Sequence, residues 1–422
     1  MMTRVHARYP TDTAPPTSGA RTGYTLMAGV LAAMMLGGTL PIPLYVLWAS
    51  RIGFGPLTVT VVFAVYVVGT LITLLFFGGL SDHIGRRRVL AAALLLAAVG
   101  TGVFLVADQV ATLVVARVLS GLAVGLASGT ATAAIAELHP RGDHRAAAVV
   151  ASGVNMAGLG LGPLLAGVLA EYAPAPLDTV FWGYLGIIAV AALALSAVPE
   201  TVSRRDGPVT LRPDIGVPAP MRGAVAGAAL AVFAAFSVLG LFSSLVPGFL
   251  RGTLGLHNLA VIGAVSFLIF VTGAISQAVF ARLPARRSVG TGLALLLCGL
   301  AGLEGALYVR TLWLFLLGTL IAGAAVGLIF RGGLAELNRL ADPGRRAAVT
   351  STYFVAAYVG MAVPSVVIGL LSRTTSLLTA SALVAGAVSL VGLTALMVAL
   401  RTFTAPSPGH LGTPGERLDQ GA

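Results

Sequence analysis

The sequence Gly78-Gly79-Leu80-Ser81-Asp82-His83-Ile84-Gly85-Arg86-Arg87-Arg88 lies between two long apolar runs and is the densest cluster of charge in the first half of the chain. Backbone that leaves a bilayer needs water or protein partners, so a charged segment between two apolar runs has to be a short turn at a membrane surface. The glycines allow a tight reversal between helices because they adopt positive φ angles readily. This stretch therefore predicts a membrane protein built from helices.

The composition of the whole chain supports that interpretation. Of 422 residues, 57% are hydrophobic and only 10% are charged, whereas a soluble domain carries about a quarter charged residues. Twelve runs are free of charge, and most reach the roughly 20 residues that a helix needs to cross the hydrocarbon core. The short run 288–303 is expected to continue past Glu304 to Val309. The runs are 22–50, 52–81, 89–107, 118–136, 146–170, 179–199, 223–250, 252–281, 288–303, 311–330, 347–372 and 374–400.

The basic residues predict the orientation of these helices. All 26 are arginines, and 20 of them fall in the loops on the side of both termini, against four in the opposite loops. Because positive residues concentrate in cytoplasmic loops, both termini are expected in the cytoplasm. The positive charge therefore reflects membrane orientation, and no nucleic-acid partner is expected. The single cysteine, Cys298, cannot form an intramolecular disulfide.

The opening stretch also resembles a family signature. The pattern Gly-x-Leu-Ser-Asp-x-x-Gly-Arg-Arg, at 78–87, is similar to the loop between helices 2 and 3 of the major facilitator superfamily of membrane transporters. The resemblance implies an all-α membrane protein with twelve transmembrane helices in two pseudo-symmetric six-helix bundles. It also implies a small-molecule substrate and a lipid bilayer as partners, with a monomer as the expected state.

An internal repeat supports two related halves. The segment Gly121–Leu126 recurs as Gly323–Leu328, and Pro163 has a counterpart in Pro364, at offsets of about 200 residues. Parallel repeats of this kind place the binding site near the midplane, between the halves. The expected division is a disordered cytoplasmic tail at 1–21, a first bundle at 22–199, a cytoplasmic linker at 200–222, a second bundle at 223–400 and a cytoplasmic tail at 401–422.

The signature loop is expected to control closure of the cytoplasmic face. By the family resemblance, Glu137 at the end of helix 4 pairs with an arginine of this loop, so we predict an Asp82–Arg86–Glu137 cluster that holds the face closed. A surface ion pair is usually worth under about 1 kcal/mol. A bistable protein, however, needs only a few kcal/mol between its states, so a partly buried network is sufficient to bias it. The other loop residues of this gating set are Gly78, Gly85 and Arg87.

Helix 5 provides a second gating candidate. The stretch Gly158-Leu-Gly-Leu-Gly162-Pro163-Leu-Leu-Ala166-Gly167 resembles the helix-5 motif of the family's antiporters, with Ala166 in place of one glycine. Small residues permit close helix contact, and proline frees a carbonyl and bends the helix. Gly162 and Pro163 are therefore expected to seal or hinge the cavity. Simple tight packing is the alternative, but it accounts less well for the Gly-Pro pair.

Proton coupling has two candidate residues. Arg117 begins an Arg-x-x-x-Gly pattern in helix 4 that resembles the family motif whose arginine is linked to proton transfer. The alternative is an arginine that extends along the helix to reach the outer surface. Glu304, near the outer end of helix 9, is the second candidate. No acidic residue lies deep in a helix centre, so coupling has to use these groups with the acids at the rim, use a proton on the substrate, or be absent.

A cavity-lining segment is expected in helix 1, where two closely spaced prolines have to bend or break the helix. Thr39 is expected to face the substrate, Tyr45 fits either the cavity or the outer aromatic belt, and Trp48 is expected in that belt. Further candidates are polar or aromatic residues of helices 5, 7, 8 and 11, although each aromatic also fits a core or lipid-facing position. They are Asn155, Phe236, Ser237, Gln277 and Tyr353.

These observations together favour a transporter of the bacterial cytoplasmic (inner) membrane. The expected function is export of a small amphiphilic or lipophilic molecule in exchange for protons. An importer or facilitator on the same fold, and a membrane sensor or scaffold that transports nothing, are the alternatives. The sequence contains no nucleophile–base pair, metal-ligand cluster or phosphate-binding loop, so we expect no enzyme, no metal and no cofactor.

Overall fold

The computed structural model describes residues 18–202, 217, 221–342 and 345–404. All regular elements in this part of the chain are helices, and twelve of them are long and apolar enough to cross a membrane. Each of the twelve uncharged runs corresponds to one of these helices. The all-α class and the twelve spans are therefore confirmed.

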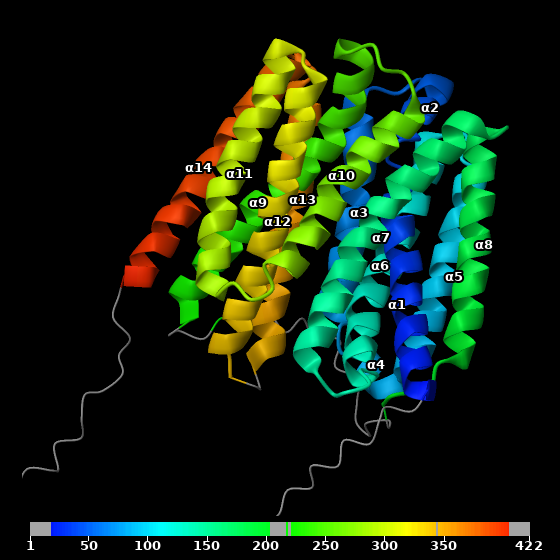
Figure 1. The fold of residues 1–422 in the computed structure, drawn as a ribbon. Coiled ribbons are helices and arrows are strands. Elements are labelled where there is room, and N and C mark those ends of the chain that lie inside the picture. The colour runs from blue at the N-terminus through cyan, green and yellow to red at the C-terminus, as the bar shows by residue number, and fades with distance from the viewer. Residues whose placement is uncertain (1–17, 203–216, 218–220, 343–344, 405–422) are drawn as a thin grey trace, which may run out of the picture.

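The helices form two bundles (Figure 1). The first contains α1 (Ser18–Thr39), α2 (Tyr45–Trp48), the π-helical turn η1 (Ala49–Gly53), α3 (Pro56–Phe76), α4 (Leu80–Ile84), α5 (Arg86–Leu105), α6 (Val110–Glu137), α7 (His144–Tyr172) and α8 (Pro176–Ala197). The second contains α9 (Arg222–Gly248), the π-helical turn η3 (Phe249–Thr253), α10 (Leu259–Val279), α11 (Ala285–Val309), α12 (Leu312–Leu340), α13 (Arg346–Leu371) and α14 (Leu377–Thr404). Most of the predicted tails and linker lies outside the described residues, so the domain boundaries stay predictions.

Two local expectations about the helices are confirmed. The prolines break helix 1: α1 ends at Thr39, residues 40–44 form turns, and α2 begins at Tyr45. Neither Pro41 nor Pro43 has an N–H to donate, which removes two bonds from the helical ladder. Helix α11 runs to Val309, past Glu304, as the continuation of the short apolar run requires.

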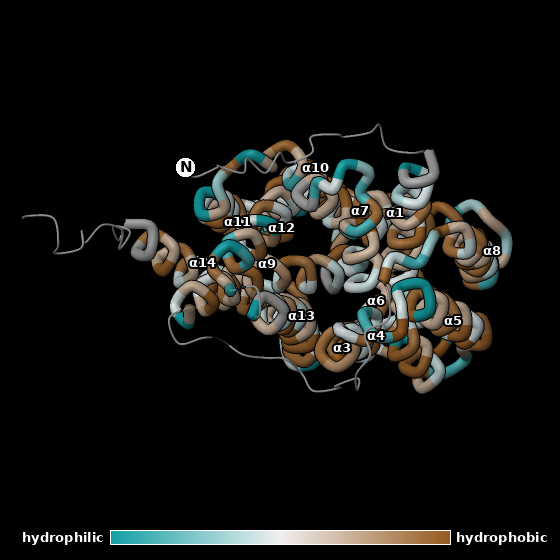
Figure 2. The backbone as a smooth tube through the Cα atoms, turned by 90° about the horizontal axis from the view of Figure 1, so that it is seen from below, coloured by the Kyte–Doolittle hydropathy of each residue, from teal (hydrophilic) through white to brown (hydrophobic). Residues whose placement is uncertain are grey.

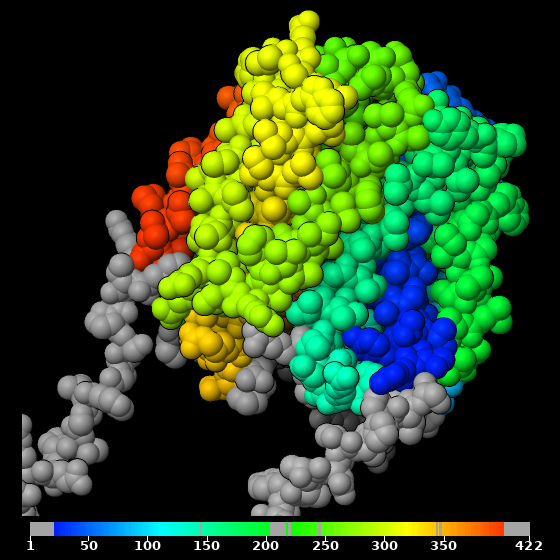
Figure 3. All heavy atoms as spheres, in the orientation of Figure 1, coloured from blue at the N-terminus to red at the C-terminus, as the bar shows by residue number. Residues whose placement is uncertain are grey.

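The bundles meet along two pairs of helices. Helix α7 of the first bundle packs on α10 of the second, and α3 packs on α13. Figure 3 shows the atoms of α10 lying directly against those of α7 on one face of the molecule. Seen along the bundle in Figure 2, α5 and α8 lie at the outer edge of the first bundle, and α11 and α14 lie on the far side of the second. The inner helices therefore position any site between the halves.

The two ends of the bundle pair differ. We call the end that carries the turn between α3 and α5 the loop end; it also holds α4, the start of α1 and the end of α14 (Figure 1). The opposite end, which holds α2, is the far end. At the far end, Gly167 of α7 lies so close to α10 that a Cβ there would collide with the carbonyl of Leu259, and Gly263 meets the carbonyl of Pro163 in the same way. Leu259 N also donates to Glu171 Oε2 at 2.7 Å. At the far end the two bundles are therefore in direct contact along α7 and α10.

Candidate functional site

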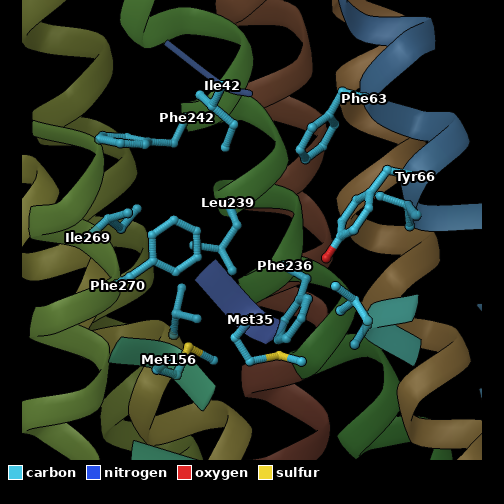
Figure 4. Packing of buried hydrophobic residues seen from close by; sticks show 14 of the residues in the cluster. Met35, Ile42, Phe63, Tyr66, Met156, Phe236, Leu239, Phe242, Ile269 and Phe270 are labelled. Atoms are coloured by element: carbon cyan, nitrogen blue, oxygen red, sulfur yellow. The ribbon is translucent and has the colours of Figure 1, made fainter. Parts of the chain in front are cut away.

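A cavity of about 160 Å³ lies between the two bundles. Its walls come from α1, α3, α6 and α7 on one side and from α9, α10, α12 and α13 on the other. Figure 4 shows Phe63, Tyr66, Phe236 and Phe270 directed toward one another across this space, with the Tyr66 hydroxyl pointing inward. Among the described lining residues none is charged. The cavity therefore suits a small solute with a large apolar surface.

A few polar groups are distributed over the cavity wall. Asn155 of α7 donates from Nδ2 to Ser128 Oγ on α6 at 3.2 Å. Ser152 of α7 donates to Gln277 Oε1 on α10, which joins the two bundles nearer the loop end. Because amides and hydroxyls have spare donors and acceptors, Asn155, Ser128 and the Tyr66 hydroxyl are positioned to orient a solute without binding a charge.

Three of the predicted cavity residues line this space, namely Thr39, Asn155 and Phe236. Four do not. Ser237 is fully buried, with its hydroxyl donating to Phe233 O at 2.7 Å, and Tyr353 donates to Phe330 O at 3.1 Å from behind the wall. Gln277 is buried against Ser152, and Tyr45 faces Arg117. These four candidates therefore lie outside the cavity wall, because their helices turn the side chains toward neighbouring helices; Tyr45, for which the cavity was one of two expected positions, occupies neither the cavity wall nor the outer aromatic belt.

The hydroxyl of Thr39 is engaged with the proline kink of helix 5. Thr39 Oγ1 donates to Leu159 O at 2.6 Å. Leu159 is four residues before Pro163, and proline has no N–H with which to satisfy that carbonyl. The Thr39 side chain of α1 therefore supplies the hydrogen bond that Pro163 removes from α7. The same bond holds α7 against the end of α1.

We expect Thr39→Val to lower the free energy of unfolding by about 1–3 kcal/mol, because it leaves a buried carbonyl unsatisfied. Thr39→Ser keeps the hydroxyl and should cost much less. In a Pro163→Ala background the cost of Thr39→Val should shrink, since an alanine at that position can donate its own N–H to Leu159 O. A double-mutant cycle on thermal stability in detergent measures this coupling. Equal costs of Thr39→Val in the two backgrounds would show that the hydroxyl does not serve the kink.

Arg117 of α6 is fully buried. Its Nε donates to Tyr45 Oη at 2.5 Å and its Nη1 to Gly38 O at 2.8 Å. Its guanidinium carbon lies 5.2 Å from the ring centroids of Tyr45 and Tyr66. No carboxylate contacts it among the described residues, and its Nη2 has no partner there. The alternative in which Arg117 reaches the outer surface is therefore excluded, and its charge sits behind the cavity wall at Tyr66.

Trp48 is part of the same buried group. The expectation that it lies in the outer aromatic belt is wrong: its side chain is fully buried, 5.5 Å from the ring of Phe104 and 5.7 Å from that of Phe181. The proline break explains the difference, because α2 starts anew after residue 44 and turns its aromatic face into the bundle. Tyr45 and Trp48 thus anchor the broken part of helix 1.

At the loop end, the structure brings together the three side chains of the predicted cluster. Arg86 Nη1 lies 2.6 Å from Asp82 Oδ1, and Arg86 Nη2 lies 2.9 Å from Glu137 Oε1. Arg86 also donates to Ser81 Oγ. All of these residues belong to the first bundle, so the ion pairs tie α4, α5 and α6 to one another and do not join the bundles in this conformation. Any gating by the cluster has to act through the shape of the loop.

Sequence reasoning missed Glu200, which completes this cluster. Its carboxylate accepts from the backbone N–H groups of Arg86 at 2.8 Å and Arg87 at 3.2 Å, at the N-terminus of α5. A carboxylate is favourable at a helix N-terminus because it satisfies free N–H groups and the helix dipole. Thr201, next in the chain, donates to Glu137. The sequence signal is an acidic residue directly after an apolar run, at the first position of the predicted linker 200–222.

Gly85 makes this contact possible. Its φ is +102°, and a Cβ there would lie 2.6 Å from Glu200 Oε2. Residues other than glycine are strained by about 1–3 kcal/mol in such backbone regions. Gly78 lies in the turn before α4, where a Cβ would meet Leu74 O. Arg87 lies in the first turn of α5, and its Nη2 donates to Ser196 O at 3.1 Å.

We therefore expect Gly85→Ala to lower the free energy of unfolding by about 1–3 kcal/mol through backbone strain and displacement of Glu200. Gly79→Ala is the matched control, because Gly79 has a φ of −90° and open space around it. Melting curves of the two variants in the same detergent make the comparison. If both variants have the melting temperature of the wild type, the positive φ at Gly85 does not constrain the residue type in this loop.

The second proton-coupling candidate lies far from the cavity. Glu304 of α11 accepts from Ser381 Oγ of α14 at 3.3 Å, between two peripheral helices, and it does not line the cavity. In the second bundle, Arg286 and Arg339 pair with Glu336 at 3.0 and 2.8 Å. This pairing repeats the Arg86–Glu137 contact, as the internal repeat leads one to expect.

Comparisons with known proteins agree with this architecture. The family model of the Major Facilitator Superfamily matches residues 26–303. The uncharacterized MFS-type transporter Rv1877 of Mycobacterium tuberculosis is 32% identical over 180 residues, which is 41% of this chain and 25% of that protein. A Salmonella paratyphi B protein named for multidrug resistance, MdtD, is 32% identical over 125 residues, 30% of this chain and 27% of that protein. The chain thus spans about a quarter of the length of these relatives.

A solved structure is similar over almost its whole length. The human organic anion transporter MFSD10 aligns with a TM-score of 0.67 at 18% sequence identity, covering 90% of this chain and 99% of that one. At that identity the likeness concerns the fold alone.

Proposed function

Because the chain belongs to the Major Facilitator Superfamily, we propose that this transporter exports a small amphiphilic or lipophilic molecule in exchange for protons, by alternating access. The observation that carries the proposal is the cavity between the bundles, whose wall is largely aromatic and aliphatic with a few neutral polar groups. Such a lining stabilises an apolar solute through burial and orients it through Asn155, Ser128 and Tyr66.

The size of the cavity supports a conformational cycle. Sites for drug-sized ligands measure roughly 300–1,000 Å³, whereas this one measures about 160 Å³. A larger solute therefore requires the bundles to separate. With the two bundles in contact at the far end through Gly167, Gly263 and Glu171, separation at the loop end admits solute, and the reverse movement releases it. The arginine bias supports a cytoplasmic loop end, in a bacterial inner membrane.

We assign gating to two groups of residues. In helix 5, Gly162 lies against the Leu36 carbonyl of α1, and Pro163 presents its carbonyl to Gly263 of α10. Helix α7 thus contacts both its own bundle and the partner bundle through small residues, as a hinge requires. At the loop end, Asp82, Arg86 and Glu137 hold the turn in shape, together with Gly78, Gly85 and Arg87.

For proton coupling, Arg117 is the stronger of the two candidates, because it contacts the cavity-lining Tyr66. Arginine keeps its proton at physiological pH, so it acts by charge on a group that does titrate or on a proton carried by the substrate. Glu304 contributes only if proton movement follows a path between α11 and α14. The lack of a carboxylate in the described cavity wall favours the second candidate function, a facilitator or importer without proton exchange.

Inverted membrane vesicles with an imposed pH gradient test the proposal. Export by antiport predicts that labelled lipophilic solutes accumulate inside inverted vesicles when the interior is acidic, and that accumulation stops when the gradient is dissipated. Movement that only equalises solute concentrations supports a facilitator. A membrane sensor or scaffold predicts no movement, and no transport phenotype for Arg117→Ala or Asp82→Asn.

A further inference from the structure

A second hollow lies on the outside of the first bundle. It measures about 780 Å³, more than the central cavity, and runs between α5 and α8 at the loop end. Its apolar part is formed by aliphatic side chains, among them Leu94, Leu95, Ile188 and Leu195, with alanines at 91, 98 and 192 between them. Figure 2 shows α5 and α8 at the outer edge of the first bundle, so this groove faces the hydrocarbon of the bilayer and not the space between the bundles.

The end of the groove nearest the membrane surface carries net positive charge. Arg87, Arg88 and Glu200 line it. The Glu200 carboxylate is held by the backbone N–H groups at the start of α5. Among the described residues, the guanidinium of Arg87 donates to a carbonyl, Ser196 O, and to no carboxylate. Arg88 is exposed, and neither arginine belongs to any ion pair found among the described residues. Two guanidinium groups are thus available to a ligand.

We propose that this groove binds a phospholipid with an anionic headgroup. Its phosphate lies at Arg87 and Arg88, and an acyl chain lies along the aliphatic lining of the groove. Basic pockets between transmembrane helices on the cytoplasmic side are suited to anionic headgroups, and guanidinium matches phosphate geometry in a bidentate manner. The lipid also contacts Gly85 and the segment at Glu200, both of which line the groove. The site rests on the fold and its charges, and it is independent of the transported solute.

Native mass spectrometry of the full-length protein tests the site. The protein is mixed in a mild detergent with equal amounts of phosphatidylglycerol and phosphatidylcholine that have the same acyl chains, and the lipids that stay bound are identified. The wild type is expected to retain more phosphatidylglycerol than phosphatidylcholine. Arg88→Gln should lower the affinity for phosphatidylglycerol about fivefold, because one arginine near an anionic surface contributes about 1 kcal/mol to binding. Arg287→Gln is the matched control: Arg287 is exposed at the start of α11, at the same end, and outside the groove.

The apolar half of the site has its own test. Ala192→Phe fills the groove and should lower retention of both lipids, whereas Ala189→Phe, exposed on the same helix outside the groove, should not. Melting curves check that each variant is folded. The proposal is overturned if Arg88→Gln retains phosphatidylglycerol as the wild type does, if Arg287→Gln loses it equally, or if Ala192→Phe changes nothing.

Discussion

Replacing Arg117 with methionine should leave a folded protein and reduce transport by about ten- to a hundredfold, the equivalent of one or two lost hydrogen bonds to a charged group. Arg117 joins α6 to the broken helix 1 through Tyr45 and Gly38, and its charge lies directly behind Tyr66 in the cavity wall. Methionine keeps much of the volume but removes the charge and the donors.

The stability of the same variant separates function from architecture. A buried cation without a carboxylate partner is costly to desolvate, and replacing buried charges with apolar groups of similar volume is often neutral or stabilising. We therefore expect Arg117→Met to melt at or above the temperature of the wild type. Arg117→Lys keeps the charge but lacks the planar fork that spans two acceptors, so its transport should be intermediate. Full transport by Arg117→Met would remove Arg117 from the mechanism.

Arg86→Gln should have the second largest effect. Within the part of the chain that the structure describes, Arg86 is the one cation that pairs with Asp82 and Glu137, whose side chains are 40% and 31% exposed. Glutamine leaves the two carboxylates without a cation between them, which should destabilise the folded loop by about 2 kcal/mol. Breaking a fully buried ion pair costs about 3–5 kcal/mol, and the cost here is lower because water reaches both acids. Since a few kcal/mol separate the states of a transporter, transport should fall about tenfold or more.

Two variants make this result specific. Adding Glu137→Gln to Arg86→Gln removes one of the opposed charges and should recover part of the lost activity and stability. Arg286→Gln alters the equivalent pair in the second bundle, where the arginine is 45% exposed, and should have a smaller effect. Transport in vesicles and the melting temperature are measured for Arg86→Gln, for the double variant and for Arg286→Gln. An Arg86→Gln protein that transports normally would rule out a gating role for the cluster.

The sequence was informative where a single physical rule dominates. Charged residues are rare in a helix that crosses hydrocarbon, so the uncharged runs predicted all twelve spans, and the proline pair predicted the break in helix 1. The contact of Arg86 with Glu137 was predicted from a motif, although the two residues are 51 positions apart. The spans and the break in helix 1 do not depend on how each helix is rotated about its axis.

The rotation of each helix about its axis was not predictable, since helices that are apolar all round show no preferred face. For that reason Tyr45, Ser237, Gln277 and Tyr353 were candidates for the cavity wall but lie behind it, and Tyr66 was missed although its hydroxyl points inward. Trp48 was misplaced because the break in helix 1 redirects the residues after the prolines. Glu200 reaches Arg86 across 114 residues, which only the packing of α8 beside α5 reveals.

The most direct test of alternating access is a pair of distance measurements between spin labels in a Cys298→Ser background, with and without a transported solute. One pair, at Tyr172 and Trp313, reports on the far end, and the other, at Arg141 and Arg282, reports on the loop end; all four side chains are exposed. Rocking of the bundles predicts two populations in which the far-end distance lengthens as the loop-end distance shortens. A single unchanging distribution for both pairs, or distances at the two ends that change in the same direction, would contradict it.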